Sequence, residues 1–73
     1  MPRPIPLKLV LKVLAREGFV FISQRGSHAK FRKKDNNVYT VIVKMNCKEI
    51  PHGTFRSILQ QSGLDETDFR NPK

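Results

Sequence analysis

The sequence offers little for covalent cross-linking or for binding a metal ion. Cys47 is the only cysteine in 73 residues. An intramolecular disulfide is therefore excluded, and a reducing cytosol is the natural compartment. Cys47 and the two histidines, His28 and His52, do not have the spacing of a metal site. We expect neither a metal nor a cofactor.

Long apolar runs are also missing. No stretch approaches the roughly 20 apolar residues needed to span a bilayer. The opening residues MPRPIP are too polar and too rich in proline for a signal peptide. We therefore expect a cytoplasmic protein that has no contact with a membrane. The length suits one small domain over 1–73, in which a ligand lies across an open face rather than in a deep pocket.

Acidic residues are scarce. The chain has 6 Asp and Glu against 14 Lys and Arg, which gives a net charge of +8. Asp65, Glu66 and Asp68 cluster near the C-terminus, so residues 1–64 are more basic than the total suggests. This balance is typical of a protein that binds polyanions, above all nucleic acid. The alternative is that the basic residues only keep the surface soluble.

Two segments have the periodicity of amphipathic helices. Apolar residues of the first recur at i, i+3, i+4 and i+7. Pro6 suits the first turn of that helix, and Gly18 suits the left-handed position after its last turn. The expected helices are 6–17 and Gly53 or Thr54 to about Gln61, followed by a short turn from Asp65 to near Phe69.

Between these helices lie three segments with strand character. Residues 19–23 are aromatic and β-branched, 28–33 alternate, and 38–44 are the most apolar. Composition predicts turns at 24–27, around Gly26, and at 34–37. The expected fold class is α+β in the order α-β-β-β-α, with a three-stranded antiparallel sheet and the helices packed on one face.

Tryptophan is absent, and Tyr39 is the only tyrosine. We place Tyr39 in the core or at the rim of the sheet, in preference to a base-stacking role. The phenylalanines are also expected in the core: Phe19, Phe21, Phe31, Phe55 and Phe69. In the first helix, Leu9 and Val13 fit neither the apolar stripe nor the opposite basic stripe, so they are interpreted as contacts with a partner.

His28 stands in the run RGSHAKF. Strand alternation places it on the same face as Lys30 and Arg32, and turns Ala29 and Phe31 toward the helices. The histidine is therefore expected on the exposed side of the sheet among cations, which argues against a buried structural role.

These residue types suit RNA cleavage. A neutral imidazole of His28 can take the proton of a ribose 2′-OH, and nearby cations can stabilise the charge that develops on phosphorus. Gly26 lets the backbone approach a phosphate, Ser27 can donate a hydrogen bond to it, and Arg25 adds charge. A lone exposed histidine among cations is more often a binding residue than a catalyst, so residue types alone leave both interpretations open.

Other cations are candidates for binding the RNA backbone. The best placed lie on or beside the His28 strand, and they are Lys30, Arg32, Lys33 and Lys34. A second set lies on the first helix and comprises Lys8, Lys12 and Arg16. Because such cations more often follow the phosphates than read the bases, we expect limited sequence specificity.

Two blocks of the sequence resemble one protein family. EGFVFISQRGSHAKF at 17–31 is similar to the "GF…RQRGSH…F" segment of the HicA toxins of prokaryotic toxin–antitoxin modules. KEIPHGTFRSILQQSGLDETDF at 48–69 is similar to their "KE…GTLRSILKQAGL…EF" segment. With the helix that precedes them, the blocks cover nearly the whole chain. The resemblance implies a fold like that of double-stranded-RNA-binding domains, which agrees with the order of elements expected above.

The same resemblance implies a function. HicA toxins cleave messenger RNA without a metal ion and slow translation, and the histidine of their GSH motif is the catalytic residue. That position is His28 here. A cognate antitoxin of the HicB kind is also implied, which would bind the toxin and cover His28. An acidic patch on that partner would complement the positive charge.

The chain departs from the family after the third strand, where many members have a proline and a basic or histidine residue. Lys44-Met45-Asn46-Cys47 stands there. His52 occupies a position that is often Lys or Arg. A role for His52 as the general acid is conceivable, but a residue at the start of a helix is the simpler interpretation. Two rival functions stay open: a non-catalytic RNA-binding module on the same fold, and a protein-interaction domain whose charge serves an acidic partner.

Overall fold

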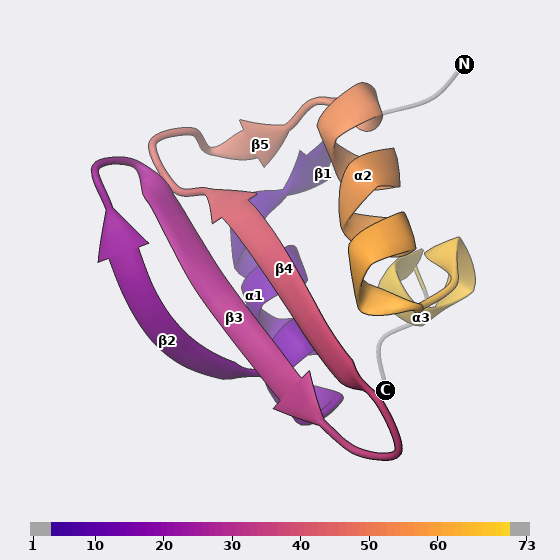
Figure 1. Cartoon of the computed structure of the whole chain (residues 1–73). Helices are drawn as coiled ribbons and strands as arrows, with labels where there is room; N and C mark the ends of the chain where they lie inside the picture. Colours follow the sequence, from indigo (N-terminus) through magenta and orange to yellow (C-terminus); the bar gives the residue numbers. More distant parts are fainter. Residues whose placement is uncertain (1–3, 71–73) are drawn as a thin grey trace.

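The structure, a computed structural model, describes residues 4–70 and has the expected α+β organisation (Figure 1). Its order confirms α-β-β-β-α followed by a short last helix, and it adds two very short strands. The elements are β1 (Ile5–Pro6), α1 (Leu7–Arg16), β2 (Val20–Arg25), β3 (His28–Lys34), β4 (Val38–Lys44), β5 (Glu49–Ile50), α2 (His52–Ser62) and α3 (Glu66–Arg70).

The main sheet is antiparallel, with strand order β2-β3-β4. The bounds of its third strand are those predicted, but β2 extends to Arg25, beyond the expected end at Ser23. The reason is that the turn before His28 has only two residues, so Gln24 and Arg25 stay in the strand. Gly26 has φ +59° and Ser27 has no positive φ, which is the pattern of a type II′ hairpin turn.

A second, two-stranded sheet was not expected. β1 pairs with β5 in antiparallel register, Ile5 opposite Ile50, and the N–H of Leu7 donates to the carbonyl of Lys48 at 2.9 Å. Both isoleucines are buried in the core. Strands of two residues are too short to produce an alternating pattern, which is why the sequence predicted only a loop from 45 to 52.

The core lies between the sheet and the helices. In Figure 1, α1 lies behind the sheet and α2 runs beside β4. The fully buried side chains of the core include Val10, Val13 and Leu14 of α1, Ala29, Val41 and Val43 of the sheet, Phe55 and Ile58 of α2, and Phe69 of α3. None of the helices in the described residues is long and apolar enough to cross a membrane.

Two expectations about apolar residues were wrong. Val13 is fully buried and Leu9 packs against the core, so neither is a free surface for a partner. The apolar face of α1 is wider than the four residues of the predicted stripe because the helix contacts both sheets and α3. Phe21 was expected in the core but is 56% exposed, since it lies on the edge strand β2. The remaining phenylalanines and Tyr39 are buried or pack against the core, as predicted.

The helix ends follow their sequence signals. Gly18 and Gly63 have φ of +96° and +73°, a conformation that only glycine adopts without strain. The backbone N–H of Asp65 donates to Oδ2 of Asp68 at 2.9 Å, one half of a capping box at the start of α3. α2 begins at His52, slightly earlier than predicted, because Pro51 serves as its N-cap.

Burial of Val13 can be tested by stability. Val13→Ala should lower the free energy of unfolding by about 1.5–3 kcal/mol because a fully buried side chain is truncated. Lys12→Ala on the exposed side of α1 should change it by less than about 0.5 kcal/mol. Urea titrations followed by circular dichroism measure both. Equal stability of the two variants would show that Val13 is not buried in the core.

Two glycines provide a second test. A Cβ on Gly63 would lie 3.1 Å from Cε1 of Tyr39 in a left-handed backbone, whereas a Cβ on Gly53, inside α2, meets nothing within 4 Å. Gly63→Ala should therefore cost about 1–2 kcal/mol, and Gly53→Ala should be neutral or stabilise by about 0.5–1 kcal/mol. The same urea titrations decide; a neutral Gly63→Ala would show that the strain at this position is relieved elsewhere.

Candidate functional site

One face of the main sheet is free of helices, and we call it the open face. Its side chains follow from the strand register, because residues opposite one another in an antiparallel pair point to the same side. It comprises Val20, Ile22, Ser23 and Arg25 of β2, His28, Lys30, Arg32 and Lys34 of β3, and Val38, Thr40, Ile42 and Lys44 of β4. The strands β2, β3 and β4 contain no Asp or Glu, so cations on the open face have no carboxylate on these strands to neutralise them.

His28 lies on the open face and is exposed, as the alternation predicted. The register sets Arg25 opposite it on β2 and Lys44 opposite it on β4. The imidazole therefore stands in a row between two cations. Within the described part of the chain, no group forms a hydrogen bond with it, so both ring nitrogens are free to meet a ligand.

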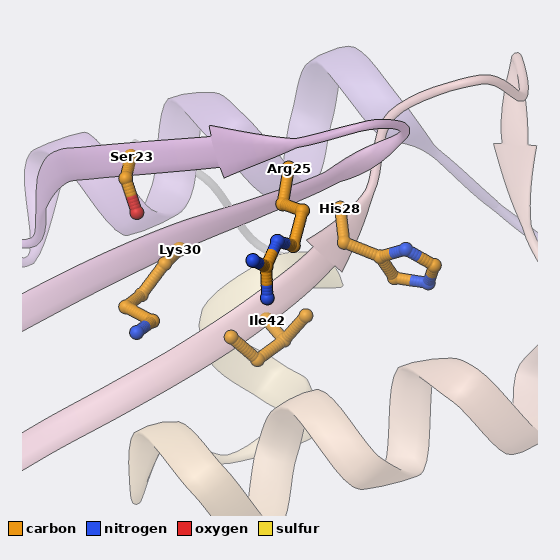
Figure 2. A pocket seen from close by; sticks show the side chains of 5 residues that line it. All are labelled: Ser23, Arg25, His28, Lys30 and Ile42. Atoms are coloured by element: carbon orange, nitrogen blue, oxygen red, sulfur yellow. The ribbon is translucent and has the colours of Figure 1, made fainter.

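A depression of about 350 Å³ surrounds this position. Ser23, Arg25, His28, Lys30 and Ile42 line it. Figure 2 shows the side chains of Arg25 and Lys30 extending to the same side of the sheet as Ile42, with the imidazole at one end of the group. The arrangement joins two basic side chains, an imidazole, a hydroxyl and one aliphatic surface, which suits a phosphate with a sugar or base beside it.

The hairpin turn before His28 is held in place by two hydrogen bonds. The side-chain Nε2 of Gln24 donates to the carbonyl of Gly26 at 2.9 Å, and the N–H of Met45 donates to the carbonyl of Ser27 at 2.6 Å. The second bond connects the β2–β3 turn to the end of β4. A Cβ built on Gly26 meets nothing within 4 Å, so the backbone of the turn is accessible to a ligand.

The other predicted phosphate contacts are divided between surfaces. Arg32 and Lys34 lie on the open face and line a second depression, of about 330 Å³, with Gly18, Val20 and Ile22. Lys33 lies on the opposite face, where its Nζ is 5.9 Å from the centre of the Phe19 ring. The structure therefore brings Arg25, Lys30, Arg32 and Lys34 to the face of His28 but separates Lys33 from it.

The second set of cations is also remote from His28. Lys8 and Lys12 are exposed on α1, whereas the open face lies on the other side of the sheet. Arg16 has partners within the molecule: its Nε lies 3.3 Å from Oε2 of Glu17, and its guanidinium donates to the carbonyl of Asp68 at 3.0 Å. Arg16 thus helps to hold α3 against α1.

Sequence reasoning missed three residues around His28. Ser23 and Ile42 line the depression, and Lys44 stands opposite the imidazole. The sequence did contain the information that places Lys44 and Ile42. The two short turns at 26–27 and 35–37 set the strand register, and the register pairs Lys44 with His28 and Ile42 with Lys30. Ser23 could not be placed, since a β-bulge between Phe21 and Ser23 shifts the register of β2. No residue pattern in the sequence predicted that bulge.

His52 is the first residue of α2, which agrees with the simpler of its two interpretations. It does not line the depression around His28. Its Nδ1 is buried without a hydrogen-bond partner among the described residues. In the same part of the chain, no three His, Cys, Asp or Glu residues are grouped closely enough to hold a metal ion.

The comparison with known families gives the family of the chain. A family model described as the HicA toxin of bacterial toxin–antitoxin modules matches residues 8–64 of the chain. The chain belongs to the HicA toxin family. The match includes the whole main sheet, and with it His28 and the open face. Membership implies an antitoxin as a partner of this HicA chain. No curated protein matches it.

Proposed function

We propose that this HicA protein is a toxin that acts as a metal-independent endoribonuclease in the cytoplasm, cleaving messenger RNA with His28 as the acid–base catalyst. The observation that carries the proposal is the row Arg25–His28–Lys44 on a sheet face without carboxylates. An imidazole between two cations, beside a depression open to solvent, has what is needed to bind a phosphodiester and to move a proton next to it.

The proposed reaction begins at the ribose. An unprotonated ring nitrogen of His28 takes the proton of the 2′-OH, and the 2′-oxygen attacks the adjacent phosphorus. A P–O bond forms, the bond from phosphorus to the 5′-oxygen breaks, and that oxygen leaves with the proton that His28 took from the 2′-OH, which restores the imidazole. The products of this route are a 2′,3′-cyclic phosphate and a 5′-hydroxyl. Because the nucleophile belongs to the substrate, the protein supplies only proton transfer and charge.

The cations have separate tasks in this proposal. Arg25 and Lys44 flank the imidazole and stabilise the extra negative charge of the pentacoordinate phosphorus. Lys30 holds the phosphate, Gly26 lets it approach the backbone, and Ser27 donates to it. Arg32 and Lys34 bind the RNA further along β3, about 13 Å and about 20 Å from His28, for four and six residues of strand. Lys33, on the other face, contributes only to the overall positive electrostatic potential of the molecule.

One observation favours a second candidate, a non-catalytic RNA-binding module. A catalytic histidine is usually oriented by a further group that bonds to its second ring nitrogen. No such group is present around His28 in the described part of the chain. In this alternative the open face binds RNA through its cations, and His28 is one of several polar contacts.

An antitoxin of the HicB kind is the proposed inhibitor. Covering His28 would exclude RNA from the depression. An acidic surface on the antitoxin would complement the open face, whose cations have no acidic neighbour on the three strands. The antitoxin and RNA would then compete for the same cations of the toxin.

Substitution of His28 distinguishes the two candidates. His28→Ala should lower the rate of RNA cleavage by about 10²–10⁴-fold, the usual contribution of acid–base catalysis, with RNA affinity reduced only slightly. The assay follows fragments of a long single-stranded RNA in EDTA and identifies the ends of the products. His52→Ala is the matched control and should cleave at the parental rate.

Equal cleavage by the parent and His28→Ala would assign the activity to another group. Retention of RNA by both proteins without cleavage by either would establish the binding module. Cleavage that disappears in EDTA would refute the metal-independent route, whatever the role of His28.

Binding strength can be tested separately from cleavage. Replacement of Lys30 by Gln should weaken RNA binding, and it should reduce the slope of log K against log salt by about 0.7, the value for one phosphate of a single strand. Lys12→Gln on α1 removes the same charge from a surface remote from the open face and should leave the slope within about 0.2 of the parent. Similar slopes for both variants would mean that RNA does not lie on the open face.

A further inference from the structure

The two edges of the main sheet differ in how they are covered. At β4, the side-chain Oε1 of Gln61 accepts a hydrogen bond of 2.9 Å from the backbone N–H of Ile42, and α2 runs beside the strand (Figure 1). At the other edge, β2 has β3 on one side only, and all of its residues are exposed. Among the described strands of this sheet, β2 therefore offers the backbone edge to which another strand can add.

The first half of β2 is apolar and faces solvent. Val20, Phe21 and Ile22 are 58%, 56% and 44% exposed. Val20 and Ile22 lie on the open face, whereas Phe21 lies on the helix side, where it packs edge-on against Phe31. Soluble proteins protect such edges with lysine, proline or inward-pointing charge, and this half-strand has none. Contiguous exposed apolar residues of this kind mark a protein-binding surface.

The surroundings of this edge are basic. The depression beside Val20 and Ile22 is also lined by Arg32 and Lys34. The Nε of Arg32 is buried and has no hydrogen-bond partner among the described residues. The residue as a whole is only half-buried, so a carboxylate brought in by an added strand could pair with its guanidinium in a charge-assisted hydrogen bond. A second copy of the chain would bring more positive charge, since each copy carries +8, and is disfavoured by repulsion.

From these observations we propose that β2 is the docking strand for an extended acidic segment of the antitoxin, which extends the sheet by pairing along Val20–Gln24. Apolar side chains of that segment pack against Ile22 and Val20 on the open face and against Phe21 on the other. An acidic side chain reaches Arg32. On the open face this patch is aliphatic, so Val20 and Ile22 do not form the aromatic stacking platforms that bind single-stranded bases. The one aromatic residue of the patch, Phe21, lies on the other face and packs edge-on against Phe31, which is why we favour protein over RNA.

This inference deepens the proposed inhibition by an antitoxin and rests on that part of the proposed function, but it does not depend on the chemistry at His28. It places the anchor of the antitoxin at the end of the open face that is remote from the imidazole. Inhibition then requires only that the rest of the bound antitoxin extends along the sheet as far as the depression around His28.

The test compares two variants that each add one positive charge to an exposed aliphatic position of the open face. Ile22→Lys places a charge on the docking edge, and Val38→Lys places one at the start of β4, where the side chain is 61% exposed. The probe is the purified antitoxin of the same module, titrated by calorimetry. Ile22→Lys should weaken binding by about 30-fold or more, the size of a hot spot, and Val38→Lys by less than about 3-fold.

Two further readouts complete the experiment. In the complex, amides of Val20–Gln24 should gain protection from hydrogen exchange as the added strand pairs with them. Without the antitoxin, Ile22→Lys should retain RNA cleavage, because it adds a cation to the open face and removes none, and the antitoxin should suppress that cleavage poorly. If Ile22→Lys loses its native circular dichroism, Val20→Lys, at the more exposed position, replaces it.

Several results would overturn the proposal. Unchanged affinity of Ile22→Lys would show that the antitoxin docks elsewhere, and lost affinity without amide protection would refute strand pairing. Protection of β2 by self-association of the isolated chain, or by an RNA oligonucleotide, would assign the edge to those occupants. A parental chain that cleaves no RNA would refute the ribonuclease proposal but would leave the antitoxin affinities fully interpretable.

Discussion

The two-residue turn between β2 and β3 determines most of what the open face presents. A type II′ turn at Gly26 and Ser27 fixes Arg25 opposite His28, and alternation then fixes the face of every later residue of β3. A shift of one residue would turn Ala29 to solvent and the imidazole into the core. The bond from Met45 to the carbonyl of Ser27 extends this constraint to β4, so three separate segments of the chain meet at one position.

The fold was largely predictable because its elements are regular. Periodicity gave both main helices and all three strands of the main sheet, and glycines at 18 and 63 marked the helix ends that the structure has. The errors arose where a pattern is too short or is broken. Strands β1 and β5 have two residues each, and the bulge in β2 changes the register without a sequence signal.

The candidate site was predicted in part. Alternation alone placed His28, Lys30 and Arg32 together, because a regular strand carries that information in every second residue. Lys44 and Ile42 come from a different strand, so their proximity to His28 depends on pairing rather than on local pattern. Val13 shows the converse problem: periodicity predicted one apolar stripe along the first helix, whereas the core contacts α1 on more than one side.

The separation of charge within the fold has a consequence for how the protein meets other molecules. The strands of the main sheet carry cations and no acids, while Asp65, Glu66 and Asp68 lie in and beside α3, which packs on α1 behind the sheet. The cations of the open face are therefore uncompensated on their strands, whereas on the other side of the molecule the acids lie beside α1, which carries Lys8, Lys12 and Arg16. An approaching polyanion would be attracted most strongly by the uncompensated side and would orient the molecule with the open face toward it. This orienting force acts only over about one Debye length, roughly 8 Å at physiological ionic strength. It therefore affects how the two molecules are oriented once they are close, and it does not draw them together from a distance.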